Sequence, residues 1–180
     1  DGLIELNTKL CDVFKDFPNC GRKITIKNLL NHTSGLIDYE DLIPDTATFQ
    51  VKDEDVLKMM YKVDSTYFEP GTQFKYSNTG YALLAMIIEK IGGKSFAQFL
   101  EENIFKPLEM ENTVAHEEGI SAVNNRAYGY ERTGSNWIRK DQSITSAVLG
   151  DGGIYSNVVD LFKWEQSLYT NKILSDELRN

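Results

Sequence analysis

Apolar residues recur at helical spacing in several stretches, and a capping residue precedes most of them. A short helix is predicted around residues 7–15, and Thr25 is expected to cap a helix that runs to Leu30. Residues 36–52 show no regular pattern. Asp53 is expected to cap the next helix, because acidic residues follow it directly and lysines come near the end of the apolar stripe. The helix dipole favours this order of charges.

The longest apolar run lies in the middle of the chain, at residues 81–91, and is predicted to form a helix. Asn78 is expected to be its N-cap, and Gly92-Gly93 to end it. Pro70-Gly71 predicts a turn ahead of this helix, since proline fixes φ and glycine takes the positive φ that follows. Tyr76 and Asn78 are therefore expected close together at a rigid corner between an extended segment and a helix.

Two further helices are predicted in the second half. Ser95 is expected to cap a helix that stops at Pro107. Ser156 is expected to cap a second helix, whose apolar positions continue through Tyr169.

Strand patterns are confined to the region between these two helices. Residues 127–131 and 136–140 flank Arg132-Thr133-Gly134-Ser135, which predicts a β-hairpin. Gly150-Asp151-Gly152-Gly153 lacks the glycine spacing of dinucleotide and phosphate loops, so close packing is the favoured interpretation of these glycines. The fold class is therefore α+β and predominantly helical, and no cofactor is predicted.

Composition and charge exclude several kinds of partner. The chain has 180 residues, enough for one domain with a real core, and its 41% hydrophobic and 26% charged content is typical of globular proteins. The formal net charge is −8 and no basic cluster offsets it, which argues against a nucleic-acid partner. The longest apolar run is about half of what a membrane span requires, and no membrane tether is visible in this segment.

The cysteines and histidines do not predict a metal site. Cys11 and Cys20 are expected to be free thiols, and no Cys-x-x-Cys or His-x-x-x-His spacing occurs. His116 is expected at the surface. His32 is expected to be a structural turn residue that bonds the backbone, because the chain has no Gly-x-Ser-x-Gly nucleophile elbow.

Tyr76-Ser77-Asn78 allows two interpretations. A tyrosine can act as a general base where a neighbouring cation lowers its pKa from about 10, and an asparagine two residues on can orient a carbonyl through its amide. Alternatively, Tyr76 is a packed side chain and Asn78 a plain N-cap. These three residues by themselves favour the second interpretation.

Four segments, in order and spacing, carry a resemblance to a known family. They are Ile24 to Leu36 (ITIKNLLNHTSGL), Glu69 to Tyr81 (EPGTQFKYSNTGY), Ile104 to Thr113 (IFKPLEMENT) and Gly150 to Leu161 (GDGGIYSNVVDL). Together they resemble the serine β-lactamase-related hydrolases: class C β-lactamases, low-molecular-weight penicillin-binding proteins such as D-alanyl-D-alanine carboxypeptidases, and related esterases and peptidases. The resemblance covers nearly the whole chain and implies a β-lactamase/transpeptidase-like fold.

The resemblance implies a site. These enzymes use a Ser-x-x-Lys nucleophile, a second box and a Lys-Thr-Gly box. Tyr76 would be the catalytic residue of the second box, relaying a proton between nucleophile and leaving group, and Asn78 would bind the substrate amide. The implied reaction is acyl transfer through a covalent serine ester, on a small molecule or a peptidoglycan-type peptide.

The chain also departs from the family pattern. It contains no Ser-x-x-Lys, and the nearest look-alike, Thr72 to Lys75, overlaps the second box. The resemblance implies that the nucleophile helix precedes Asp1 and that the third box follows Asn180. Residues 1–180 are therefore expected to be a partial domain, truncated at both ends and inactive by itself. The alternative is a non-catalytic pseudoenzyme or binding module that reuses the fold.

Overall fold

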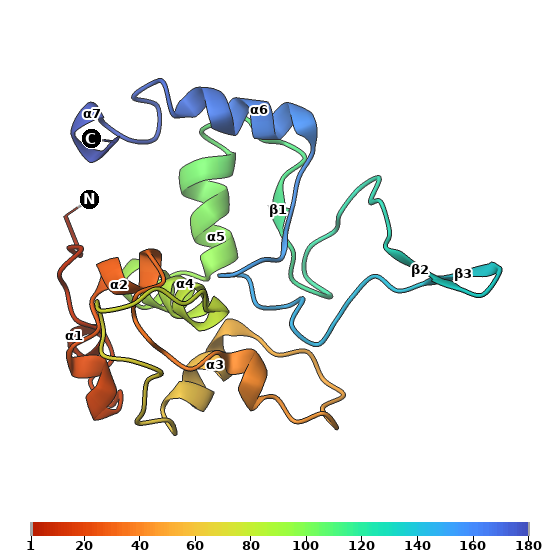
Figure 1. Ribbon diagram of the computed structural model, residues 1–180. Helices are drawn as coiled ribbons and strands as arrows, with labels where there is room; N and C mark the ends of the chain where they lie inside the picture. The colour runs from red at the N-terminus through yellow and green to blue at the C-terminus, as the bar shows by residue number, and fades with distance from the viewer. Residues whose placement is uncertain (1, 180) are drawn as a thin grey trace.

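The computed structural model describes residues 2–179, in which helices surround the central helix α4 (Asn78–Gly92). Helices α2 (Ile26–Leu30) and α3 (Asp53–Met60) lie against α4, and α5 (Phe96–Leu100) contacts it near its C-terminal end (Figure 1). These neighbours bury the apolar side chains Ala82, Leu83, Ala85 and Ile87 of α4.

The N-terminal segment contains less helix than its sequence predicts. Only α1 (Leu10–Val13) is helical where a helix was expected over residues 7–15. The N–H of Leu10, the first of the helix, donates to the carbonyl oxygen of Ile24 at 2.8 Å and joins the start of α1 to a later segment. The prediction of a short helix around residues 7–15 is therefore confirmed, with a helix of only four residues.

Short turns of helix connect these elements. Residues Asn19–Arg22 form the 3₁₀ turn η1, and residues Tyr39–Leu42 form the 3₁₀ turn η2 within the segment that showed no pattern. Thr25 caps α2 as predicted, since its Oγ1 accepts the N–H of Asn28 at 3.2 Å.

The core has two parts. The larger part lies among α1, α2, α3 and α4, and the smaller part lies where α5 meets the chain that follows it. Fully buried side chains of the larger part are Leu10, Ile24, Leu29, Tyr39, Val51, Val56, Met60, Ala82, Leu83 and Val148. The smaller part comprises Leu100, Phe105, Leu108, Met110, Ala115 and Leu149.

Helix α5 begins where the sequence predicts it to begin. The Oγ of Ser95 accepts the N–H of Gln98 at 3.2 Å, which confirms Ser95 as the N-cap. The helix continues as the π-helical turn η3 (Glu101–Phe105) and ends before Pro107.

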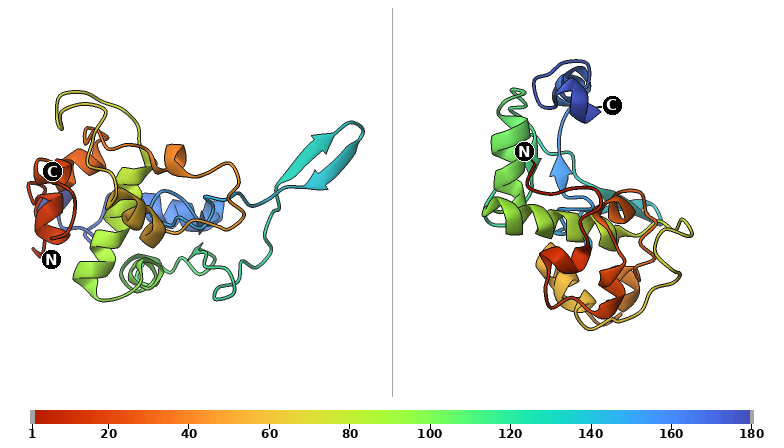
Figure 2. Two further views of the ribbon diagram at one scale, coloured as in Figure 1. Left: turned by 90° about the horizontal axis from the view of Figure 1, so that it is seen from below. Right: turned by 90° about the vertical axis from the view of Figure 1, so that its left-hand side faces the viewer.

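The strands form two separate antiparallel pairs. Strand β1 (Val114–Ala115) pairs with β4 (Ile154–Tyr155), and β2 (Tyr130–Thr133) pairs with β3 (Asn136–Arg139) in the predicted hairpin. The hairpin turn is two residues long, shorter than predicted, because Thr133 pairs directly with Asn136. Figure 2 shows the hairpin projecting away from the helices.

The C-terminal part contains α6 (Val158–Ser167) and α7 (Asp176–Arg179). The N-cap of α6 is Asn157 rather than Ser156, since the Asn157 side chain accepts the N–H of Asp160 at 2.8 Å. The helix also ends at Ser167, before the predicted end at Tyr169. Within the described residues, no helix is both long and apolar enough to cross a membrane.

Asp53 does not cap α3. Lys52 occupies the N-cap position, and the buried carboxylate of Asp53 accepts the N–H groups of Leu149 at 2.7 Å and Gly150 at 2.9 Å. Burial raises the pKa of Asp53, and the two hydrogen bonds oppose that rise. Asp53 therefore joins α3 to a loop that lies almost a hundred residues later in the sequence.

Gly150 packs directly against α4. A Cβ at this position would lie 2.3 Å from the carbonyl oxygen of Tyr81, so only glycine fits. This contact supports the packing interpretation of Gly150–Gly153. Cys11 and Cys20 are free thiols, as predicted, and burial raises the pKa of Cys20 to about 11.

We expect Gly150→Ala to destabilise the protein by about 2 kcal/mol, because the added methyl group would force α4 and the loop apart. Gly152→Ala is the matched control, since its Cβ would approach nothing closer than 3.9 Å. Urea unfolding of both variants measures the difference. Equal stability of the two variants would contradict the close contact.

Candidate functional site

Tyr76 lies on the surface immediately before α4 and is 61% exposed. Its ring packs against the imidazole of His32 with centroids 4.4 Å apart and the ring planes tilted by 34°, and Tyr81 contacts the same imidazole at 5.2 Å. His32 has a φ of 56°, and its Nδ1 accepts the N–H of Ser77 at 3.4 Å, so it is the backbone-bonded turn residue that the sequence predicts. The ring of Tyr76 is thus held, while its hydroxyl forms no hydrogen bond within residues 2–179.

Lys75 is the cation next to Tyr76 in sequence, but it points elsewhere. Its Nζ lies 3.3 Å from the centroid of the Tyr67 ring, a cation–π contact. In the described part of the chain, no lysine or arginine forms a cation–π contact with Tyr76.

Asn78 is the first residue of α4 and not its N-cap. Ser77 holds the N-cap position without a side-chain capping bond, and its buried Oγ has no hydrogen-bond partner within residues 2–179. Asp38 supplies the missing acceptor, since its Oδ2 accepts the N–H of Asn78 at 3.0 Å. A carboxylate is favoured at this positive end of the helix dipole. The prediction of Asn78 as the N-cap is wrong, because Asp38 accepts the first N–H of the helix instead. The Asn78 side chain therefore takes no part in capping.

Residues 37–40 clamp the first turn of α4. The Nδ2 of Asn78 donates to the Oε1 of Glu40 at 3.1 Å. The N–H of Tyr39 donates to the Oγ1 of Thr79 at 2.8 Å, and that hydroxyl donates to the carbonyl oxygen of Ile37 at 2.9 Å. Both Tyr39 and Thr79 are fully buried. We call residues 37–40 the 37–40 clamp.

The clamp also reaches the Gly150–Gly153 loop. The hydroxyl of Tyr39 donates to the Oδ2 of Asp151 at 2.8 Å. Burial raises the pKa of Asp151 to about 6; the hydrogen bond from Tyr39 opposes the rise, and the nearby carboxylates of Asp53 and Glu40 add to it. Burial and the same hydrogen bond raise the pKa of Tyr39. Asn78 and Asp151, far apart in sequence, are therefore held by one short segment.

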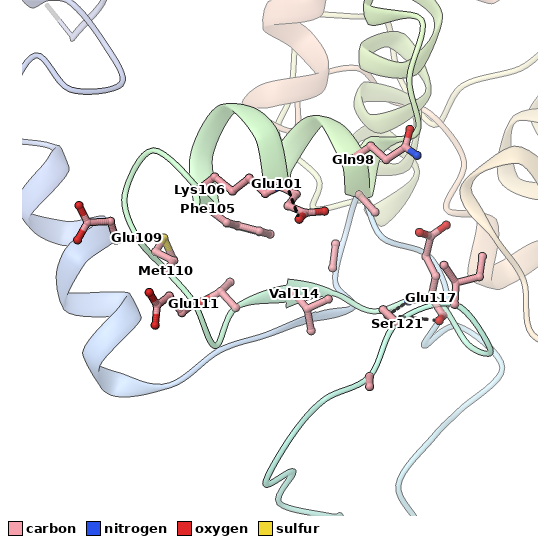
Figure 3. A pocket seen from close by; sticks show the side chains of 15 residues that line it. Gln98, Glu101, Phe105, Lys106, Glu109, Met110, Glu111, Val114, Glu117 and Ser121 are labelled. Atoms are coloured by element: carbon pink, nitrogen blue, oxygen red, sulfur yellow. Dashed lines mark hydrogen bonds and ion pairs between the residues drawn. The ribbon is translucent and has the colours of Figure 1, made fainter.

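A cavity of about 750 Å³ lies elsewhere, between the α5–η3 helix and β1. Figure 3 shows Phe105 and Met110 facing β1 across this space, with Glu109 and Glu111 at one end and Glu117 at the other. Neither Tyr76 nor Asn78 lines it. Because the candidate catalytic groups lie elsewhere, this cavity is not the candidate site. Across residues 2–179, no group of three or more His, Cys, Asp and Glu side chains is arranged to hold a metal ion.

The comparisons with known proteins decide the family. The Beta-lactamase family model matches residues 1–180, the whole chain. The chain belongs to the β-lactamase family. Among its relatives, penicillin-binding protein 4* of Bacillus subtilis (strain 168) is 35% identical over 97% of this chain and 41% of its own length. The D-aminopeptidase of Brucella canis is 30% identical over 78% of this chain and 27% of its own length.

Solved structures of β-lactamase-family folds match over nearly the whole chain. D-amino acid amidase from Ochrobactrum anthropi SV3, complexed with L-phenylalanine amide, has a TM-score of 0.81 at 26% identity and covers 99% of this chain and 52% of its own. The octameric penicillin-binding protein homologue from Pyrococcus abyssi has a TM-score of 0.80 at 25% identity, over 99% of this chain and 42% of its own. The chain thus spans about half or less of these relatives, and its mixture of helices with few strands is consistent with a partial fold.

The structure brings Tyr76 and Asn78 together at the start of α4, as the sequence predicts. Sequence reasoning missed Asp38 and Glu40, which bond Asn78, and the role of Asp151, which bonds Tyr39. The run Asp38-Tyr39-Glu40-Asp41 was a usable signal, because three acidic residues in a segment without pattern often mark a cap or a binding loop.

We expect Asp151→Asn to stabilise the protein increasingly as pH rises from 4 to 6. The pKa of Asp151 lies above its ordinary value of 3.8, so the native state binds this proton more tightly and loses stability as the carboxyl ionises. A shift of about two units corresponds to roughly 3 kcal/mol, which solvent screening at this partly exposed group reduces to about 1 kcal/mol. The measurement is the free energy of unfolding at pH 4, 5 and 6.

Asp45→Asn removes a carboxylate at an exposed position and serves as the control substitution. A stability difference for Asp151→Asn that does not change with pH would contradict the raised pKa.

Proposed function

We propose that this chain is the central part of a penicillin-recognising serine hydrolase that acts by acyl transfer through a covalent serine ester. The observation that carries the proposal is the placement of Tyr76 and Asn78 on the clamped start of α4, in a chain that belongs to the β-lactamase family. The nucleophilic serine, its lysine and the third box lie in other parts of the whole protein.

Tyr76 relays a proton in this proposal. Its hydroxyl has no hydrogen-bond partner within residues 2–179, and packing against His32 holds the exposed ring. A tyrosine so placed can take the proton of the attacking serine and return it to the leaving group, together with the lysine of the nucleophile motif.

Asn78 binds the substrate amide. Its backbone is fixed by Asp38 and its side chain by Glu40, so the amide is presented in one orientation. Preorganised polar groups of this kind lose little entropy when the substrate binds.

The names of the relatives suggest two substrate classes. Penicillin-binding proteins suggest a β-lactam or a peptidoglycan-type peptide, as for a D-alanyl-D-alanine carboxypeptidase. The D-aminopeptidase and the D-amino acid amidase suggest a small amide, and esterase activity suits the same groups.

In the full-length protein, Tyr76→Phe should leave the fold intact and slow acylation by a fluorescent penicillin by about 10²- to 10⁴-fold, the usual contribution of a general base. Tyr130→Phe is the matched control, because Tyr130 is similarly exposed on the hairpin at 57%. The rate of covalent labelling, followed on a gel, measures both. An unchanged rate for Tyr76→Phe would remove this residue from the mechanism.

The 180-residue chain alone should not be labelled by fluorescent penicillin, because it contains no Ser-x-x-Lys nucleophile. The full-length protein, prepared alongside it, should be labelled. Labelling of the short chain would overturn the expectation that it is inactive. A full-length protein that is never labelled and hydrolyses no amide would support the alternative, a pseudoenzyme or binding module.

A further inference from the structure

His32 contacts three consecutive residues just before α4. Its carbonyl oxygen accepts the N–H of Lys75 at 3.0 Å, and its Nδ1 accepts the N–H of Ser77 at 3.4 Å. Between these two residues lies Tyr76, whose ring packs against the imidazole of His32 with centroids 4.4 Å apart. One residue therefore holds the backbone on both sides of Tyr76 and the ring of Tyr76 itself.

The imidazole of His32 lies among aromatic rings. Besides Tyr76, the ring of Tyr81 packs against it with centroids 5.2 Å apart, and Phe74 meets it edge-on at 6.0 Å. Tyr81 is itself fixed, because its hydroxyl donates to the carbonyl oxygen of Leu30 at 3.0 Å. The half-buried imidazole is thus held in one orientation by its neighbours and by its bond to the backbone.

The turn that carries His32 is bonded to the segment that leads to Tyr76. Next to the bond between residues 75 and 32, the N–H of Gly71 donates to the carbonyl oxygen of Thr33 at 2.8 Å. These bonds hold His32 at a φ of 56°, a left-handed conformation that is unfavourable for most residues with a side chain. Glycine or asparagine would meet the demands of the turn with less strain. The turn alone therefore does not explain a histidine at this position.

Tyr76 lacks a hydrogen bond that would fix its phenol. Its side chain is 61% exposed, its hydroxyl has no hydrogen-bond partner within residues 2–179, and His32 carries the only aromatic ring in that range that packs against it. A general base must be held within hydrogen-bond reach of the proton that it takes. The place of the Tyr76 hydroxyl therefore depends on His32.

We propose that His32 is the positioning residue of the proton relay, and that its imidazole places the hydroxyl of Tyr76 for proton transfer between the serine and the leaving group. This inference rests on the proposed function, in which Tyr76 relays the proton. His32 acts through Tyr76: the imidazole face supports the phenol, and the two backbone bonds keep Lys75 and Ser77 in place on either side of it.

Two variants of the full-length protein separate the ring of His32 from its hydrogen bond. His32→Asn keeps an acceptor close to the backbone and suits the positive φ, but it removes the ring. His32→Phe keeps an aromatic ring, but it removes the acceptor and is strained at this φ. We expect His32→Asn to be the more stable of the two in urea unfolding and His32→Phe to be the faster in acylation.

Labelling by fluorescent penicillin over a range of concentrations gives the acylation rate constant and the non-covalent affinity separately. His32→Asn should lower the rate constant by about 10- to 100-fold, as expected for a displaced catalytic group, and change the affinity by less than about twofold. His32→Phe should stay within about threefold of the wild-type rate constant. Rates that follow the stabilities of the two variants instead would show a purely structural role and overturn the inference.

A double-mutant cycle with Tyr76→Phe tests whether His32 acts through this tyrosine. In the Tyr76→Phe protein, His32→Asn should slow acylation by no more than about twofold, because the hydroxyl that it positions is already gone. An equal slowing in both backgrounds would contradict the inference. His116→Asn is the matched control, since His116 is the other histidine of the chain and packs against a different tyrosine, Tyr155, at 5.4 Å. It should leave the rate unchanged.

Labelling of the wild-type protein separates the two possible failures. A wild type that is labelled, with a His32→Asn variant that is labelled equally fast, overturns the positioning role while the serine hydrolase stands. A wild type that is not labelled and hydrolyses no amide overturns the proposed function and the positioning role with it.

Discussion

The hydrogen bond from the first N–H of α4 to Asp38 organises the candidate site. A helix N-terminus leaves several N–H groups without partners, and a local side chain usually satisfies one of them. Here the local candidates, Ser77 and Asn78, do not do so, and the acceptor comes from a segment forty residues earlier. Because Asp38 accepts this N–H, the Asn78 side chain is not needed as a helix cap. The same hydrogen bond fixes the 37–40 clamp beside Asn78.

The carboxylates of the buried Asp53 and the half-buried Asp151 extend the same arrangement to a second loop. Asp53 accepts two backbone N–H groups of residues 149 and 150, and Asp151 accepts the hydroxyl of Tyr39. Removing a carboxylate from water is unfavourable, and the raised pKa of each group expresses that cost. Hydrogen bonds recover part of it. The result is a loop held in register with the start of α4 by directional contacts, which apolar packing alone would not supply.

Most local signals were read correctly from the sequence, and non-local ones were not. Thr25 and Ser95 cap their helices through residues three positions away, and the hairpin forms from two strands that are adjacent in the chain, whereas the cap of α6 lies one residue later than predicted. Asn78 and Asp53 were expected to cap helices but bond elsewhere, since their partners lie about forty and a hundred residues away in sequence. Tyr76 and Asn78 were recognisable as a pair from the motif. The residues that orient Asn78 were not, because no local pattern links residue 38 or 40 to residue 78.

The hairpin β2–β3, unlike the clamp, is not packed against the core. All eight of its strand residues are exposed, and it projects from the helices as an arm of two strands (Figure 2). Two strands without a covered face gain little stability from packing, so the turn and the cross-strand pairs must maintain their shape. Neither part of the core depends on it. Insertions, deletions and substitutions can therefore accumulate in this arm at little cost to folding, and related chains are free to differ there in length while keeping the clamp and α4 unchanged.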